Sequence, residues 1–181
     1  AFHQDEVDLH DSVMKAFDKY FRLEATIKQF PKKSLAEIYI NHSVLARQFS
    51  NWFNDGATNK QVPEFLLNLP PKKQSNLIRG LWAGDGYIYK DRAKAAYKTS
   101  SINLAHQLKI LLLRQGIVPT ISINKAYKNH KTSYSVQIPG YDDFKKLCRI
   151  LEHKTKIMKK PGGKPPIIRN KLFVYLPISR I

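Results

Sequence analysis

The sequence has 181 residues, 43% of them hydrophobic and 11% aromatic, which is typical of a folded protein and excludes a disordered one. Its net charge of +17 makes nucleic acid the leading candidate partner. A single cysteine, Cys148, excludes an internal disulfide and a thiolate-rich zinc site, and no apolar run reaches membrane-spanning length. We therefore expect a soluble intracellular protein of the cytoplasm or nucleoid, with Cys148 as a buried small side chain.

The positive charge is concentrated in one part of the chain. Residues 1–76 contain 10 basic and 9 acidic residues, whereas residues 77–181 contain 21 and 5. A surface that serves only solubility usually mixes both signs. The asymmetry therefore favours nucleic-acid binding over a merely solubilising surface.

The elements predicted for the first part of the chain begin with a helix. It covers residues 5–21, where apolar residues recur at near-helical spacing and acids crowd the first turns. The following elements are two strands, a helix, a loop and a short helix that starts with proline. Their ranges are 23–30, 34–41, 42–53, 54–63 and 63–69.

The second part begins with a helix over residues 75–84 that ends in "GDG". A hairpin, a helix stopped by Gly116, a strand pair, a helix, a loop and a final strand follow. Their ranges are 87–101, 102–117, 120–138, 141–151, 159–166 and 172–181.

The order helix, strand, strand, helix occurs twice, which predicts an internal repeat. "AFHQDEVDL" from residue 1 aligns with "AYKTSSINL" from residue 96, so that His3 falls opposite Lys98. Further along, "SLAEIYI" overlays "SYSVQIP". Identities are few, so the prediction of two similar halves rests mainly on the order of elements.

The segment "LIRGLWAGDG" at residues 77–86 contains the most informative spacing. Gly80 and Gly84 lie four apart on one helix face, where small residues let a second helix approach closely. Asp85 would sit at the C-terminal end of that helix, which is electrostatically unfavourable for a carboxylate. A bound divalent cation would compensate that charge, although a plain Asp-Gly turn between helix and strand also fits this segment alone.

"IRGLWAGDG" resembles the signature of the LAGLIDADG homing endonucleases. Five residues fit the pattern and Ala83 replaces its first acid, which varies in that family; the five are Ile78, Gly80, Leu81, Asp85 and Gly86. "NKQVPEFLLNLP", which precedes Asp85, resembles a Lys-x-x-Pro element of intein-encoded members, and "FVYLPISRI" resembles their exit strand. The resemblance covers nearly the whole chain and is strongest to the endonuclease domain of an archaeal-type intein.

The resemblance implies an α/β (α+β) fold of two pseudo-twofold-related αββαββα halves with saddle-shaped antiparallel sheets. Residues 1–74 would be the remainder of the first half, residues 75–160 the second half, and residues 161–181 a C-terminal loop and exit strand. Residue 1 aligns with residue 96, so the repeat would put the partner of residues 78–86 before Ala1. The first half is therefore expected to be incomplete and to lack its motif.

The resemblance also implies a function: sequence-specific double-strand cleavage of DNA at a long target site, as in intron or intein homing. Asp85 would be the catalytic metal-binding acid, with Gly84 as a second metal-binding position and Mg²⁺ as the cofactor. Lys60, Lys98 and Lys156 would be the catalytic lysines, with Lys154 and Lys164 as alternatives to Lys156.

The strands of the second half would supply the DNA contacts, because strand residues alternate between the two faces of a sheet. The candidates are polar, aromatic or basic: Tyr87, Tyr89, Arg92, Lys94, Lys125, Tyr127, Lys128, Lys131, Ser133 and Tyr134.

Only one active acid is present, and three explanations are open: a missing N-terminal segment of the same protein, a trimmed or degenerate copy, or a homodimer. The first is preferred, and it predicts that these 181 residues bind DNA but barely cleave it. The alternative function is a non-cleaving DNA- or RNA-binding module on the same scaffold, such as a maturase or regulator. A general RNA-binding protein is disfavoured, since no signature of the common RNA-binding modules is present.

Overall fold

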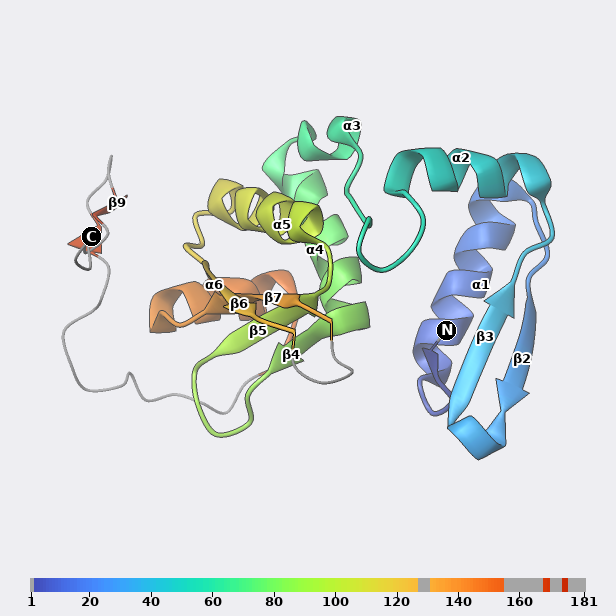
Figure 1. The fold of residues 1–181 in the computed structure, drawn as a ribbon, viewed down its shortest axis with the longest axis horizontal. Helices are drawn as coiled ribbons and strands as arrows, with labels where there is room; N and C mark the ends of the chain where they lie inside the picture. The colour runs from blue at the N-terminus through green and yellow to red at the C-terminus, as the bar shows by residue number, and fades with distance from the viewer. Residues whose placement is uncertain (1, 127–130, 155–167, 170–173, 176–181) are drawn as a thin grey trace. The chain divides into compact units, whose positions relative to one another are not determined.

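The computed structural model describes residues 2–126, 131–154, 168–169 and 174–175. Two compact units are distinguished, residues 1–51 and residues 52–181, and each is described by itself (Figure 1). In the described part of the chain, no helix combines the length and apolar character that a membrane crossing requires.

The first unit is a small sheet with helices. Its described elements are β1 (Phe2–His3), α1 (Val7–Phe21), β2 (Thr26–Phe30), the 3₁₀ turn η1 (Pro31–Lys33), β3 (Leu35–Tyr39) and the start of α2 (Ser43–Phe53). The strands are antiparallel in the order β1-β3-β2. Arg22, in the left-handed conformation, ends α1 and turns the chain towards β2.

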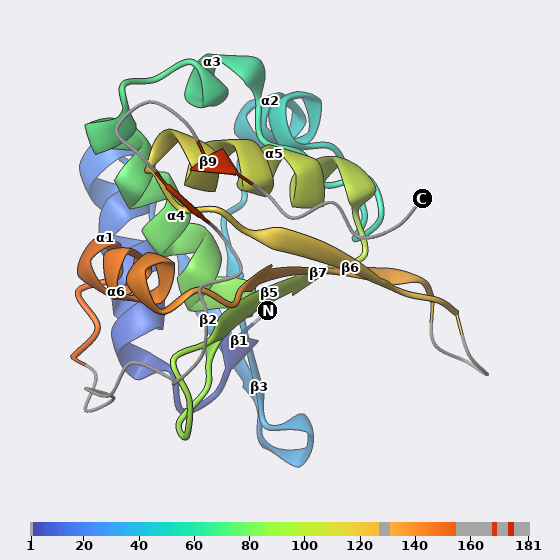
Figure 2. The same ribbon diagram turned by 90° about the vertical axis from the view of Figure 1, so that its left-hand side faces the viewer.

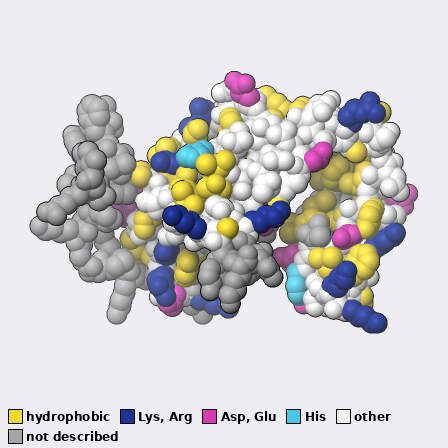
Figure 3. All heavy atoms as spheres, viewed as in Figure 1, with side chains coloured by type: hydrophobic (Ala, Val, Ile, Leu, Met, Phe, Trp, Pro, Cys, Tyr) yellow, Lys and Arg dark blue, Asp and Glu magenta, His cyan; other side chains and the backbone are white. Residues whose placement is uncertain are grey.

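This unit buries few side chains. Among its described residues only Ala36 and His10 are buried, and every residue of β2 is exposed. Val7, Tyr20 and Val44 are each more than half exposed. Figure 3 shows hydrophobic side chains on the surface of this unit, in the right-hand body. The unit thus has regular secondary structure with a very small buried core among its described residues.

The second unit has a helical layer on one face of an antiparallel sheet (Figure 2). Its sheet has the order β4-β5-β7-β6, built from β4 (Gly86–Ile88), β5 (Ala95–Thr99), β6 (Thr120–Asn124) and β7 (Ser133–Ile138). Its helices are α3 (Glu64–Leu67), α4 (Pro71–Asp85), α5 (Ile102–Arg114) and α6 (Tyr141–Ile150). A separate strand pair, β8 (Ile168–Arg169) and β9 (Val174–Tyr175), completes the described elements.

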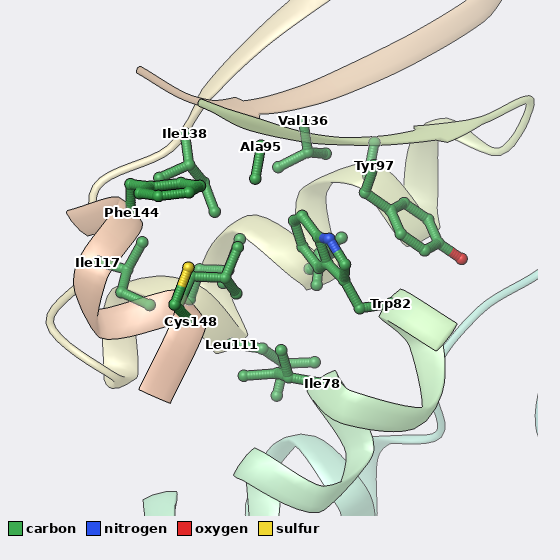
Figure 4. Close-up of a cluster of buried hydrophobic side chains, with 14 of the residues drawn as sticks. Ile78, Trp82, Ala95, Tyr97, Leu111, Ile117, Val136, Ile138, Phe144 and Cys148 are labelled. Atoms are coloured by element: carbon green, nitrogen blue, oxygen red, sulfur yellow. The ribbon is translucent and has the colours of Figure 1, made fainter. Parts of the chain in front are cut away.

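The core of the second unit lies between this sheet and α4, α5 and α6. Figure 4 shows Ile78 and Trp82 of α4 facing side chains of the sheet and of the other two helices. Ala95, Tyr97, Val136 and Ile138 point into the core from β5 and β7, and Cys148 is buried there as predicted. Alternation along each strand therefore leaves the opposite, outer face of the sheet free of this core.

The predicted repeat is confirmed in element order. Strand, helix, strand, strand and helix follow one another as β1-α1-β2-β3-α2 and as β5-α5-β6-β7-α6, with sheet orders β1-β3-β2 and β5-β7-β6. The strand register corrects the overlay by one residue. Phe2 pairs with Ala36, and Tyr97 pairs with Val136, so the buried Ala36 corresponds to the buried Val136 and not to Ser135. A one-residue slip would have exchanged the two faces of the strand.

Most predicted elements are present with shifted ends. The motif helix begins at Pro71, four residues earlier than predicted, because proline suits the first turn of a helix. Gly116 ends α5 with a positive φ of 68°, as expected for a helix stop. The predicted loop 159–166 and much of the final strand lie outside the described residues. The predicted division at residue 74 stays a prediction, whereas the compact units divide between Asn51 and Trp52.

Candidate functional site

Asp85 is the last residue of α4, and its side chain is exposed. The chain passes directly from this helix into β4, because Gly86 adopts an extended conformation with φ −85° and ψ 151°. The Gly86 amide donates to the Trp82 carbonyl and closes the last turn. The helix and the strand together therefore hold the carboxylate at a fixed corner of the second unit.

Position 86 requires glycine because there is no room for a side chain, and not because of its backbone conformation. A Cβ at position 86 would overlap the Trp82 indole and lie 2.5 Å from the Trp82 carbonyl oxygen. Gly86 also lies opposite Tyr97 in the β4–β5 pair, and the Tyr97 and Trp82 rings pack with centroids 5.8 Å apart. The absent side chain thus leaves room for two aromatic rings beneath the site (Figure 4).

Tyr97 connects this packing to the acid. Its ring is buried, and its hydroxyl donates to Asp85 Oδ2 over a long 3.4 Å contact. Burial raises the pKa of Tyr97 well above its ordinary value, and the negative charge and hydrogen bond of Asp85 raise it further. Tyr97 therefore remains a neutral hydrogen-bond donor beside Asp85 over the physiological range.

This raised pKa predicts a loss of stability at alkaline pH. The folded protein holds the Tyr97 proton more tightly than the unfolded chain does. The protonated hydroxyl therefore contributes its full stabilisation to the free energy of unfolding below a pH of about 10, and this stabilisation is lost as the pH rises further. The slope is at most about 1.4 kcal/mol per pH unit. Tyr97→Phe should remove this part of the fall in the free energy of unfolding, measured by denaturant titration from about pH 10 upward. An unchanged fall in Tyr97→Phe would contradict the assignment.

The predicted lysines Lys60 and Lys98 line the same open pocket as Asp85. The pocket has a volume of about 380 Å³, and its other lining residues are Ala57, Thr99, Ser100 and Ser133. Lys60 comes from the loop before α3, Lys98 from β5 and Asp85 from the end of α4, and all three are exposed. One carboxylate, two ammonium groups and several hydroxyls therefore converge from segments far apart in the sequence.

A second, more apolar pocket of about 300 Å³ lies along α4 and shares Lys60 and Asp85 with the first. Gly80 and Gly84 line it, and an added Cβ at either would meet none of the described atoms within 4 Å. The small-residue face predicted for α4 is thus present and exposed within the described unit. Its use as the contact face for a second helix stays a prediction.

The outer face of the sheet holds two of the predicted DNA-contacting residues within its strands, Tyr87 and Ser133, together with the predicted catalytic Lys98. Tyr87 pairs with Ala96 in the row that continues through Gln137 to Thr120. Lys98 lies in the adjacent row with Ser135 and Ser122. Ser133 lies on the same face by alternation, although it is only 8% exposed.

An aromatic and cationic cluster lies at the β4 edge of the sheet. The Tyr87 and Tyr89 rings meet edge to face with centroids 4.9 Å apart. The Arg92 guanidinium and the Lys94 ammonium lie 5.4 and 5.5 Å from the centre of the Tyr89 ring. Arg92 also forms a 2.7 Å ion pair with Asp91, which reduces its free charge. Lys125 and Lys131, at the ends of β6 and β7, are exposed.

One predicted DNA contact lies on the other face of the sheet, and two predicted contacts and one predicted catalytic lysine cannot be placed. Tyr134 lies on the core face and packs against the hydrophobic cluster, because it alternates with Ser133 and Ser135 along β7. Tyr127, Lys128 and Lys156 lie outside the described residues, as does the alternative Lys164. The other alternative, Lys154, is exposed after α6 but does not line the pocket with Asp85.

The sequence reading missed a set of uncharged polar side chains on the outer face. They are Thr120, Ser122, Asn124, Ser135 and Gln137. A Gln137 Nε2 to Ser122 Oγ hydrogen bond of 2.8 Å orders two of them. The signal was present: "TISIN" and "SYSVQI" alternate polar and apolar residues, which predicts two faces. Such donors and acceptors can read base edges.

The residues around Asp85 could hold Mg²⁺ as an ion that is shared with the substrate. No group of three histidine, cysteine, aspartate or glutamate residues that could hold a metal occurs among the described residues. Mg²⁺ is often held by one or two carboxylates together with substrate phosphates and water. The Asp85 carboxylate and the backbone of Gly84, in the final turn where carbonyls lack intrahelical donors, suit such a shared ion.

Comparison with known proteins gives one family match and several relatives. A family model described as a LAGLIDADG-like domain matches residues 72–152. The chain is 32% identical over 125 residues to an uncharacterized protein, MJ1054, of Methanocaldococcus jannaschii. It is 29% identical over 152 residues to the ATP-dependent DNA helicase Hel308 of Thermococcus kodakarensis. It is 30% identical over 169 residues to the replicative DNA helicase DnaB of Nostoc.

The matched region is a small part of each of these relatives. The alignments cover 65%, 75% and 82% of this chain but only 14%, 13% and 19% of the three proteins. Among solved structures, a mesophilic variant of the homing endonuclease I-DmoI matches with a TM-score of 0.56. That match covers 82% of this chain and 73% of the other at 17% identity, which establishes a shared fold.

Proposed function

Because residues 72–152 form a LAGLIDADG-like domain and the chain has the α+β fold of a homing endonuclease, we propose that the protein is a DNA endonuclease. It binds duplex DNA at a long specific site and hydrolyses phosphodiester bonds with divalent metal ions. The observation that carries the proposal is the pocket in which Asp85, Lys60 and Lys98 meet.

The outer face of the sheet is proposed to lie against the DNA. Its centre offers uncharged hydrogen-bonding groups, whereas its margins carry lysines and the Tyr89 cation cluster. Polar groups at the centre suit base edges, and cations at the margins suit phosphates. The pocket opens next to Ser133 and Lys98 of this same face. A bound backbone would therefore reach Asp85 while the sheet reads the neighbouring bases.

In the proposed reaction, the Asp85 carboxylate and the Gly84 backbone would hold a divalent metal ion. When bound, such an ion would supply Lewis-acid stabilisation of the phosphate and a water of lowered pKa. Lys60 and Lys98 would stabilise the negative charge that develops on the phosphate. The hydroxyl of Tyr97 orients the Asp85 carboxylate from below. A second carboxylate would come from another segment of a longer protein or from a second copy of the chain.

The helicase matches support a proposal about origin. Two helicases of different kinds share this segment, which covers under a fifth of each. A DNA polymerase of Thermococcus hydrothermalis also shares it, at 26% identity over 9% of its length. A mobile domain inserted into different hosts would give this distribution. We therefore propose that the chain is the endonuclease domain of an intein-type element.

The test begins with DNA binding. Duplexes selected from a random library should bind the chain with a preferred sequence, and binding should weaken steeply with salt. Lys98→Met should weaken binding of the selected duplex about eightfold at 0.1 M salt and reduce the log–log salt slope by about 0.9, because one phosphate contact is lost.

The matched control for Lys98 is Lys146→Met. It removes the same charge from α6, on the helical side of the sheet, where the Lys146 ammonium donates to the Gly116 carbonyl at 2.6 Å. Binding should change little. Equal losses in both variants would show that only net charge matters and would contradict binding through the outer face. Failure to select any preferred sequence would contradict sequence-specific binding.

One observation favours a second candidate, a non-cleaving binding module. Asp85 is the only carboxylate among the residues that line the described pocket. A chain that selects a specific duplex but shows no metal-dependent cleavage in any assembly would support this candidate.

A further inference from the structure

Lys60 lies in a loop, yet the backbone on both sides of it is held by hydrogen bonds. The Gln61 amide donates to the Phe53 carbonyl at 3.0 Å and closes the loop 53–61. The next residue, Val62, is buried, although Lys60, two residues before it, is exposed. A lysine on a free loop would sample many positions, whereas this one begins from a fixed backbone.

Gln107 of α5 holds Val62 from the opposite side. Its Oε1 accepts from the Val62 amide at 2.7 Å, and its Nε2 donates to the Val62 carbonyl at 2.9 Å. A carboxamide offers one acceptor and a donor in the same plane, so it pairs with an extended residue as a peptide group would. This two-point contact fixes both the position and the orientation of Val62 across 45 residues of sequence.

Ser101 holds the carbonyl of Lys60 itself. Ser101 is completely buried at the N-terminus of α5, where its Oγ accepts from the Leu104 amide. The same Oγ donates to the Lys60 carbonyl at 2.6 Å. Since the Ser101 hydroxyl has one proton and gives it to Lys60, the helix cap and the loop anchor form a single unit.

We propose that Gln107 and Ser101 are positioning residues that hold the Lys60 ammonium over the pocket shared with Asp85 and Lys98. Neither side chain lines that pocket, so both act through the Lys60 backbone. The inference rests on the proposed function only in that a DNA phosphate occupies the pocket. In this proposal, the N-terminal part of α5 aligns Lys60 of the loop before α3 with Asp85 at the end of α4.

The test is a double-mutant cycle on duplex DNA affinity, which requires no cleavage. Lys60→Met should weaken binding about eightfold at 0.1 M salt, because one phosphate contact is lost. Gln107→Met keeps every charge and should still weaken binding about threefold. The double variant should bind as Lys60→Met does, because Gln107 acts only through Lys60. Additive losses, or a Gln107→Met protein that binds like the wild type, would overturn the proposal.

Gln115→Met is the matched control, at the C-cap of the same helix. Gln115 donates to the Pro71 carbonyl at 2.8 Å, so it anchors the start of α4 in the same manner but away from Lys60. Its loss should leave DNA affinity unchanged. A loss equal to that of Gln107→Met would show a general loosening of the unit and would overturn the specific role.

Amide hydrogen exchange on the wild-type chain keeps the proposal testable if a variant fails to fold. The Val62 amide should exchange slowly, as a bonded amide does, and the Gln107→Met change should accelerate it without affecting the amides of β5. Fast exchange of Val62 in the wild type would overturn the anchoring. By contrast, wild-type affinity in Lys98→Met would count against DNA binding by the outer face, and would leave the Gln107 result to be judged separately.

Discussion

Asp85→Asn is expected to abolish metal-dependent DNA cleavage while DNA binding is kept. The substitution preserves the shape of the side chain and its contact with the Tyr97 hydroxyl, but it removes the only carboxylate that lines the pocket. Metal stabilisation of developing charge is worth several kcal/mol, and each 1.36 kcal/mol is tenfold in rate. The single-turnover cleavage rate should therefore fall about a thousandfold or more.

The measurement is Mg²⁺-dependent cleavage of the selected duplex by an assembly that supplies the second carboxylate, a longer protein or a dimer, together with the dissociation constant. Affinity should stay the same or rise slightly, because a negative charge is removed from a surface that we propose faces phosphates. Asp142→Asn is the control, since Asp142 is an exposed carboxylate in the first turn of α6 and does not line the pocket. Cleavage by Asp85→Asn within tenfold of the wild-type rate would refute the metal-binding role of this acid.

Gly86→Ala is expected to destabilise the second unit by about 3 kcal/mol, through overpacking of a site with no free space. The new methyl group would overlap the Trp82 ring and its carbonyl. Neither can move easily, because the indole is buried against Tyr97 and the carbonyl closes the last turn of α4. The free energy of unfolding from denaturant titration measures the effect.

Gly84→Ala is the matched control two residues away. Its Cβ would point into open space among the described residues, and alanine is favoured over glycine inside a helix. The free energy of unfolding should rise by up to about 1 kcal/mol. Equal destabilisation by both substitutions would show that backbone conformation, and not the Trp82 contact, selects glycine at position 86.

The order of helices and strands and the acid at the end of α4 could be predicted from the sequence. Both depend on local patterns: the spacing of apolar residues, the proline and glycine punctuation, and the two glycines around Asp85. The repeat was also visible, but its register was shifted by one residue at β3. Few identities constrain that overlay, whereas the pairing of Phe2 with Ala36 fixes it.

Which side chains join Asp85 was decided by the tertiary structure. Lys60 and Lys98 were candidates among 31 basic residues, and the sequence could not show that loop, strand and helix end meet at one pocket. Tyr134 was misplaced for a related reason. A tyrosine side chain suits a DNA contact, but the face of the sheet on which Tyr134 lies depends on which alternate residues of β7 meet the helices.

The sequence by itself therefore determined the type of most elements, the concentration of charge and the candidate acid at the end of α4, because these follow from interactions between near neighbours in the chain. The tertiary structure alone decided the anchoring of Lys60 by Gln107, the space that requires Gly86 and the polar face of the sheet. Each depends on a contact or register between distant segments, such as the hydrogen bonds that span 45 residues. Those contacts form only when the packing of α4, α5 and α6 against the sheet fixes where each segment lies.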